Sequence, residues 1–563
     1  MKTLALSTLA LGIALSPQHV LAEHKQPKLV LQVTVDALRG DLPERFKHSF
    51  GDGGFKLLLD NGIHYRNAHF QHSNTETIVG HAALATGAPP AVNGMVGNVW
   101  YDRTQGRAVY NIEDANYSLL NSGGGVDQST EIDSTQRVAK GDGRSPMNIH
   151  TSTISDEIIK ANNGKSKAFS VSFKDRGAVS LGGELGKAFW FSKSANAFVT
   201  SDYYYEKNPE WVDTWNAKGF TDQYSSQRWE LSLPQEQYLF ADDGDVEYKI
   251  DLANFKRSFP HPYGPSDFKY FTTLLSLSPA GDEIVADFAK TVLDEEKLGQ
   301  GDYTDYLSVS FSANDYVIHM YGPSSIEAED NLVRLDRTLA QLFAHIDETV
   351  GLKNTLIVLS ADHGAPDVPG YVNALGGNKA DYFGLDKMKQ SGVFDAVEKQ
   401  FGLGEDVVRQ YADPYVYLNH EVITAKGHNI ADVQSVIARQ LEGIDGIDQA
   451  ITATDIMKRQ LADTRINQLV TNNHHPIRSG DIYVVYNPNV YINDFDGLKV
   501  ASVHGSPWRY DTYVPVIFAG MDIEGKKVSR EVTPYDIAPT LSQYLNITFP
   551  SGATGTVLEE VVD

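Results

Sequence analysis

KLVLQVTVDALRGDL, residues 28–42, is the stretch that decides the fold. Its apolar run is typical of a strand buried on both faces, and Asp36 and then a turn follow it. The same order of buried strand and polar residues recurs in DYLSVSFSANDYVIHMYG (305–322) and in NTLIVLSADHGAPD (354–367). The sequence therefore predicts three parallel strands, each ending in acidic or histidine side chains.

A helix is expected between the last two of these strands. EDNLVRLDRTLAQLFAHIDETV (329–350) has apolar residues at helical spacing. Strand, helix and strand in this order predict an α/β fold with a mostly parallel central sheet and helices on both faces. A shorter strand, TYVPVIFAG (512–520), comes near the end of the chain.

Two regions depart from this pattern within a catalytic domain expected over residues 23–563. Residues 185–300 are rich in aromatic residues, Asp and Pro, and we interpret them as an irregular insertion over the strand ends. Residues 370–490 hold short helices and β-like runs, which indicate a subdomain. Ligands of such folds bind beyond the carboxyl ends of the strands, so these additions are expected over the active-site edge.

The composition limits the classes of partner. The chain of 563 residues has a formal net charge of −25, which argues against a nucleic acid as a bound partner. An anionic substrate would need strong local positive charge, from metal ions or from a Lys/Arg pair. There is no cysteine, so neither disulfides nor a lipid-anchored terminus is expected.

The N-terminus has the pattern of a secretory signal peptide. Its first 22 residues are MKTLALSTLALGIALSPQHVLA. They contain Lys2, then an apolar run, then small residues before an expected cleavage site near Ala22. It is too short for a membrane span, and no later segment is long and apolar enough for one. We expect a bacterial protein that is exported to the periplasm or secreted, without a membrane anchor.

The strand ends and one later turn supply candidate metal ligands. Asp315 and His319 are spaced i, i+4, so one helical turn would present both on the same side. Mixed Asp/His sets suit zinc or a similar divalent ion, and six residues are enough for two metals with three ligands each. The candidates are Asp36, Asp315, His319, Asp362, His363 and His504. We interpret His474 and His475 as part of a solvated loop.

Thr77, in TETIVGHAALATGAPP (75–90), is the candidate nucleophile. A helix is expected to begin near Gly80, with the Thr77 hydroxyl just ahead of it, where an anion is favoured. The simpler interpretation is that Thr77 only caps this helix. Two metals nearby would suit an in-line displacement, in which the nucleophile is either water or a side-chain hydroxyl.

Together these motifs resemble the alkaline phosphatase superfamily. The residues around Thr77, continued as AVNGMVGNVWYD to residue 102, look most like the phosphate-irrepressible (PafA-type) alkaline phosphatases and the related nucleotide pyrophosphatase/phosphodiesterases. VTVDALRGD, SFKDRGA (172–178), SANDYVIH, SADHGA and VHGSPWRYD stand in the family's order, over nearly the whole chain after residue 22. The enteric-type alkaline phosphatases use a serine nucleophile and a third, magnesium site; neither pattern is found in this sequence, so we expect no dedicated magnesium site.

The resemblance implies a role for each candidate. One zinc ion would be held by Asp36, Asp362 and His363, and the other by Asp315, His319 and His504. Thr77 would lie between the two zinc ions, contact both and form a covalent phosphothreonine. Asn98, Lys174 and Arg176 would bind the phosphoryl oxygens.

The resemblance thus implies an exported alkaline phosphatase with two Zn²⁺ per chain. It would hydrolyse small phosphate monoesters and release inorganic phosphate. Separately, we expect the chain to be a monomer. A phosphodiesterase on the same scaffold is the first alternative, and Lys174 with Arg176 argue against it because diester enzymes of the superfamily lack that pair. A sulfatase would need a different nucleophile motif. A catalytically inactive exported protein that binds metal or phosphate is the alternative from another class.

Overall fold

The computed structural model describes residues 25–121, 123–377, 379–495 and 497–562. The predicted signal peptide, 1–22, lies outside the described residues. Within the described ranges, no helix combines the length and the apolar character that crossing a membrane requires.

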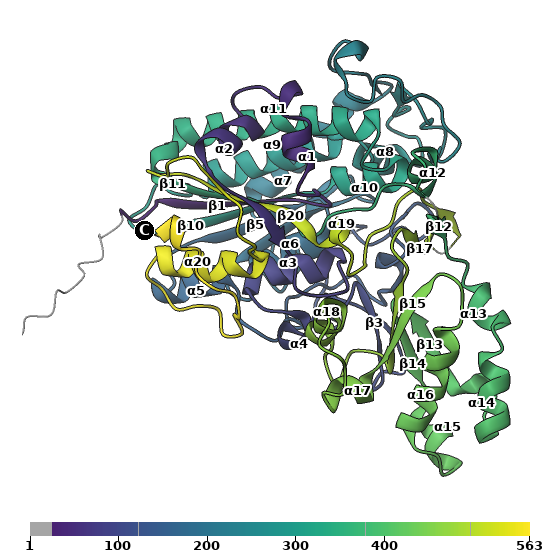
Figure 1. The fold of residues 1–563 in the computed structure, drawn as a ribbon. Coiled ribbons are helices and arrows are strands. Elements are labelled where there is room, and N and C mark those ends of the chain that lie inside the picture. The colour runs from purple at the N-terminus through teal and green to yellow at the C-terminus, as the bar shows by residue number, and fades with distance from the viewer. Residues whose placement is uncertain (1–24, 122, 378, 496, 563) are drawn as a thin grey trace, which may run out of the picture.

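A nine-stranded sheet forms the centre of the molecule, in the order β21-β2-β20-β11-β1-β10-β5-β6-β7 (Figure 1). Its strands are β1 (Leu29–Val35), β2 (Ile63–His69), β5 (Ala168–Ser172), β6 (Lys187–Ser192), β7 (Ala197–Val199), β10 (Asp305–Phe311), β11 (Thr355–Ser360), β20 (Tyr513–Gly520) and β21 (Lys526–Val528). Five of the eight pairings are parallel, and both pairings of β20 and the edge pair β6–β7 are antiparallel. The prediction of a mostly parallel sheet is confirmed.

Helices cover both faces of this sheet, as predicted (Figure 1). One face carries α9 (Pro279–Glu295), α10 (Ala313–Tyr321) and α11 (Ile326–Thr349), and the other carries α3 (Thr77–Thr86), α5 (Ile154–Ala161), α6 (Asp175–Gly182) and α20 (Ile537–Tyr544). The apolar stripe expected on α11 is buried in the core, at Leu332, Leu335, Leu339, Leu342 and Phe343.

A second, smaller sheet lies within the 370–490 part, which stands at the lower right of Figure 1. Its order is β13-β14-β16-β15, with bounds Val408–Ala412, Tyr415–Leu418, Ile482–Tyr486 and Ile447–Thr452. Its apolar side chains pack with those of α14 (Val393–Phe401) and α16 (Ile430–Leu441) into a core separate from that of the large sheet.

Part of the predicted insertion over 185–300 belongs to the main sheet instead. β6 and β7 extend that sheet by two strands, and α9 packs on its face. Between them, Trp229 donates a hydrogen bond to Asp330 of α11 (2.6 Å), so this stretch covers a helix of the main body. The aromatic residues that suggested an irregular insertion are buried along the sheet edge and against the helices.

Short elements complete the chain. The remaining helices are α1 (Leu42–Arg45), α2 (Phe55–Asn61), α4 (Pro90–Asn93), α7 (Glu210–Ala217), α8 (Phe271–Ser276), α12 (Pro369–Ala374), α13 (Asp386–Gln390), α15 (His420–Ala425), α17 (Ala453–Met457), α18 (Arg465–Asn473), α19 (Arg509–Thr512) and α21 (Glu559–Val562). Paired short strands are β3 (Val99–Asp102) with β4 (Arg107–Tyr110), β8 (Arg228–Trp229) with β9 (His261–Pro262), β12 (Asp381–Tyr382) with β17 (Val490–Tyr491), and β18 (Asp494–Phe495) with β19 (Leu498–Lys499).

Candidate metal centre and active site

The three strands that carry candidate ligands are neighbours, in the order β11-β1-β10. Their registers place Val35 beside Phe311 and Thr34 beside Ser360, so all three end at the same edge. The polar residues that follow them are buried: Asp36 after β1, Asp315 in the first turn of α10, and Asp362 after β11. Parallel strands thus bring together carboxylates that lie hundreds of residues apart in the chain.

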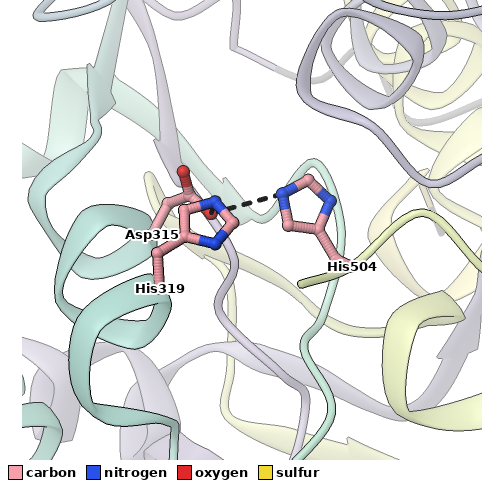
Figure 2. A group of neighbouring side chains, drawn as sticks. All are labelled: Asp315, His319 and His504. Carbon is pink, nitrogen blue, oxygen red and sulfur yellow. Dashed lines mark ion pairs between the residues drawn. The ribbon is translucent and has the colours of Figure 1, made fainter. Parts of the chain in front are cut away.

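The first group of possible metal ligands is Asp315, His319 and His504, shown in Figure 2. Asp315 and His319 project from the same helix, and Oδ1 of Asp315 lies 3.2 Å from Nε2 of His319 and 3.4 Å from Nε2 of His504. Backbone carbonyls hold the other ring nitrogens, because Nδ1 of His319 lies 2.7 Å from Ser502 O and Nδ1 of His504 lies 2.8 Å from Thr75 O. A metal-binding histidine is commonly oriented in this way.

The second group is Asp36, Asp315 and His363, so Asp315 belongs to both. Nε2 of His363 lies 3.3 Å from Oδ1 of Asp36, while its Nδ1 lies 2.8 Å from Gly364 O. Asp362, which the resemblance assigns to this site, is adjacent, with its Oδ2 3.4 Å from Nε2 of His363. The structure therefore assembles the six predicted ligands at one place, with Asp315 shared between the two groups.

The buried polar atoms of these groups fit divalent cations. Burial of a charged oxygen without a partner is costly, so such atoms are expected to bind something. Within the described residues, four atoms here are buried without a well-oriented hydrogen bond, although histidine nitrogens lie 3.1–3.4 Å from the three oxygens: Asp36 Oδ1, Asp315 Oδ1, Asp362 Oδ2 and His363 Nε2. Carboxylate oxygens and imidazole nitrogens are ligands that zinc and similar ions accept.

Lys174 lies between the carboxylates of the two groups. Its Nζ is 2.7 Å from Oδ2 of Asp36 and 2.5 Å from Oδ2 of Asp315. Burial works to lower the pKa of the Lys174 ammonium, but the carboxylates of Asp315 and Asp36 raise that pKa above its usual range. Lys174 is thus a buried cation at the candidate metal centre.

Thr77 is the first residue of α3, so this helix begins three residues before the predicted start at Gly80. The Thr77 hydroxyl accepts a hydrogen bond from Nη2 of Arg176 (3.3 Å). Nη1 of Arg176 is held in turn by Oδ2 of Asp133 (2.6 Å). Asn98 is adjacent, since its Oδ1 accepts from the backbone N–H of Ile78 (3.1 Å), which leaves its NH₂ group as a donor.

These side chains meet in a cavity of about 470 Å³. Of the predicted residues, Thr77, Asn98, Lys174, Arg176, Asp315, His319 and His504 line it. Asp36, Asp362 and His363 are fully buried beside them. The 370–490 part reaches this cavity through residues 410–413, whereas none of the described residues of 185–300 lines it.

Two acidic residues of the site were given no role from the sequence. Asp133 anchors Arg176, but it lies in a polar stretch without periodicity that offers no signal. Glu76 accepts hydrogen bonds from the backbone N–H of Asn98 (2.7 Å) and from Nδ2 of Asn74 (3.0 Å). Burial raises the pKa of Glu76 to about 7, although these hydrogen bonds act in the opposite direction. In the sequence, the only indication that Glu76 belongs to the site is that it directly precedes Thr77.

Gly80 lets α3 approach the metal centre. A Cβ at this position would lie 1.9 Å from the backbone oxygen of Asp362, which no real contact allows. Gly80→Ala must therefore push α3 away from Asp362, and we expect it to destabilise the fold by about 1–3 kcal/mol or more. Urea unfolding measures this loss. Gly141→Ala is the control, because its Cβ would meet no atom within 4 Å; equal stability of the two variants would contradict the packing argument.

Comparison with known proteins shows the family to which this chain belongs. The model of the family described as "Type I phosphodiesterase / nucleotide pyrophosphatase" matches residues 30–507. The chain is 32% identical to alkaline phosphatase PhoV of Synechococcus elongatus, over 95% of this chain and 93% of the relative. It is 31% identical to alkaline phosphatase PafA of Elizabethkingia meningoseptica, over 95% of each. The crystal structure of wild-type PafA matches with a TM-score of 0.86 and 30% identity, over 96% of this chain and 99% of that chain.

Proposed function

Since this chain belongs to the type I phosphodiesterase/nucleotide pyrophosphatase family of the alkaline phosphatase superfamily, we propose that it is an alkaline phosphatase that hydrolyses phosphate monoesters. Two relatives bearing that name are alike over almost the full length, which supports the activity. The observation that carries the proposal is the cavity in which the Thr77 hydroxyl, the Arg176 guanidinium and the ligand group around Asp315 lie together.

We further propose that two zinc ions bind at this centre. Asp36, Asp362 and His363 would hold one, and Asp315, His319 and His504 the other, with Asp315 near enough to serve both. Bound there, the ions would offset the negative charge of a phosphoryl group and lower the pKa of a hydroxyl that they contact. The buried atoms of Asp36, Asp315, Asp362 and His363 that lack a well-oriented hydrogen bond support this assignment.

Thr77 would act as the nucleophile. Its Oγ1 gives up its proton to water and forms a bond to phosphorus as the bond from phosphorus to the ester oxygen breaks, and the leaving alkoxide takes a proton from water to become the alcohol. Water then attacks the phosphothreonine, which releases inorganic phosphate and restores the Thr77 hydroxyl. The position of Thr77 at the start of α3, within reach of Arg176, supports this role.

Arg176, Asn98 and Lys174 would bind the phosphoryl oxygens. Asp133 holds the guanidinium group of Arg176 in place, so this side chain loses little conformational entropy when a substrate binds. The NH₂ group of Asn98 adds a neutral donor. The ammonium of Lys174 contacts Asp36 and Asp315, and it would turn to the phosphoryl group once those carboxylates bind metal.

We also propose that residues 1–22 direct export and that residues 23–563 act as a monomeric catalytic domain with a subdomain over about 370–490. The support for export is the pattern of Lys2, apolar run and small residues near Ala22. Among the described residues, no helix has the length and apolar character of a membrane span. The substrates would be small phosphate monoesters.

A phosphodiesterase is the competing function, and the description of the family favours it. The double variant Lys174→Ala, Arg176→Ala distinguishes the two functions when its monoester and diester turnover are compared with those of the wild type. Each charge-assisted hydrogen bond contributes roughly 1.5–3 kcal/mol, so the double variant should lose on the order of 10²–10⁴ in kcat/KM for p-nitrophenyl phosphate. A diester has one charged oxygen fewer, so turnover of bis-p-nitrophenyl phosphate should fall far less.

The matched control is Lys218→Ala with Arg439→Ala, which removes the same charges at exposed positions. This control should keep both activities. An equal loss of monoester and diester turnover in the Lys174/Arg176 variant would mean that the pair only supports the fold or general anion binding. The assignment as a monoesterase would then fail.

A further inference from the structure

A second cavity, of about 780 Å³, lies on the opposite side of β3 from the first. Successive side chains of a strand point to opposite faces, so Val99 lines the first cavity while Trp100 and Asp102 line the second. The loop 474–481 and the starts of α15, α16 and α17 form its other walls. His474 and His475, interpreted from the sequence as a solvated loop, are half-buried here.

Arg478 is a cation of this cavity without a carboxylate partner. Its guanidinium lies 4.6 Å from the ring centre of Trp100. Nη1 donates to Gly94 O and to Asn148 O (2.7 Å each), and Nη2 donates to Nε2 of His150 (2.8 Å) and to Oδ1 of Asn148 (3.4 Å). None of the ion pairs found among the described residues includes Arg478. All of these partners are neutral, so the positive charge is not compensated by them.

Gly94 makes this position of Arg478 possible. Its φ is +85°, and a Cβ there would lie 2.7 Å from Nη1 of Arg478 and 2.8 Å from Nδ1 of His150. Burial lowers the pKa of the Arg478 guanidinium to about 10, and the carboxylate of Asp102 offsets only part of this effect. The backbone thus makes room for a partly buried cation that lacks a close anion.

The acidic residues of the cavity are already engaged. Asp481 accepts hydrogen bonds from Nη2 of Arg103 (2.9 Å), Nε2 of His420 (2.7 Å) and Nε2 of Gln434 (2.9 Å). Oδ1 of Asp102 accepts from the backbone N–H groups of residues 104 (2.8 Å) and 105 (2.9 Å). Neither carboxylate forms an ion pair with Arg478, although this chain carries a net charge of −25.

The histidines beside Arg478 add neutral donors. A guanidinium only donates, so Nε2 of His150 accepts and its Nδ1 carries the proton. Nδ1 of His475 accepts from the backbone N–H of Ile477 (3.4 Å), which leaves the proton on Nε2. Burial, with the charge of Arg478, lowers the pKa of His475 to about 4, so this ring is neutral at pH 7.

We propose that this cavity binds the oxyanion group of a small molecule, a phosphate, sulfate or carboxylate, through the uncompensated positive charge of Arg478 and the Nε2–H group of His475. Its volume is in the range of small-molecule sites. The side chains of Met457 and Ile477 are 61% and 73% exposed at its wall, where they would cover an apolar part of the ligand. This binding site is separate from the proposed catalytic cavity and does not depend on its activity.

Sulfate and citrate are the probes, titrated calorimetrically at low ionic strength into the full chain. Arg478→Met removes the charge but keeps an apolar stem over Trp100, and it should weaken binding at least about tenfold. His475→Gln keeps a donor and should weaken binding less. The matched control is Arg439→Met, an exposed arginine on α16 without an ion pair among the described residues, which should bind as the wild type does.

Two further measurements keep the test decisive. The sulfate titrations are repeated in the Lys174→Ala, Arg176→Ala background with and without Arg478→Met, so that the difference between these two proteins reports the second cavity whatever the catalytic centre still binds. Crystals soaked in tungstate should show anomalous density beside Arg478, and this arm stands even if Arg478→Met fails to fold. Equal affinity in folded Arg478→Met and wild type, or tungstate density that is absent from this cavity, would overturn the proposal.

Discussion

Thr77→Ala is expected to lower kcat/KM for p-nitrophenyl phosphate by about 10³-fold or more, because the variant lacks the proposed nucleophile. The surrounding donors would remain, since Arg176 is held by Asp133 and Asn98 by the backbone of α3. Thr77 is the first residue of α3, and the residue at the N-cap position is Glu76, so the fold should keep its stability when the Thr77 hydroxyl is removed. Steady-state rates with a thermal unfolding curve measure both quantities.

Thr77→Ser is the matched control, because it retains the hydroxyl and removes only a methyl group. It should keep a substantial part of the activity, and a rapid acid quench should trap phosphate on the serine. A Thr77→Ala variant that turns over at a near-normal rate would contradict covalent catalysis and would indicate direct attack by water.

Metal removal is expected to abolish activity, with a loss of at least about 10³-fold that zinc restores. Because Asp315 belongs to both ligand groups, Asp315→Asn should lower the content of both ions. The measurement is elemental analysis of the purified protein together with turnover before and after dialysis against a chelator. A joint loss of metal and turnover in Asp315→Asn would show that the activity depends on the carboxylate that both ligand groups share.

Asp330→Asn serves as the control for Asp315→Asn. Asp330 is also a fully buried carboxylate, but it accepts hydrogen bonds from Trp229 and Ser232 and lies outside both ligand groups. It should keep its metal content even if it loses stability. Full activity of metal-free wild-type protein, or unchanged metal in Asp315→Asn, would contradict the proposed centre.

The sequence was sufficient for the parts of the fold that follow from local pattern. The buried runs before Asp36, Asp315 and Asp362 predicted strands that became neighbours in one sheet, and the stripe of α11 predicted its buried face. It was insufficient along the sheet edges. β6 and β7 lie within an aromatic-rich region whose pattern does not distinguish an edge strand from an irregular insertion.

The same limit applies to the site. Spacing alone predicted that Asp315 and His319 share a face, because one helical turn joins them. The contacts of Lys174 with Asp36 and Asp315 depend on three separate elements, and no local pattern encodes them. Gly80 was taken as the start of a helix, whereas the glycine is required inside α3 by the close approach of Asp362.

The position of β20 in the sheet has a consequence for the order in which the chain folds during synthesis. β2 ends at His69, yet it reaches the sheet's centre only through β20, which begins at Tyr513. A ribosome must therefore release nearly the whole chain before the early strand finds its neighbour, and pairings of such long separation form slowly. β2 thus stays unpaired until late in synthesis, while β1, β10, β5, β6 and β7 can already pair with one another.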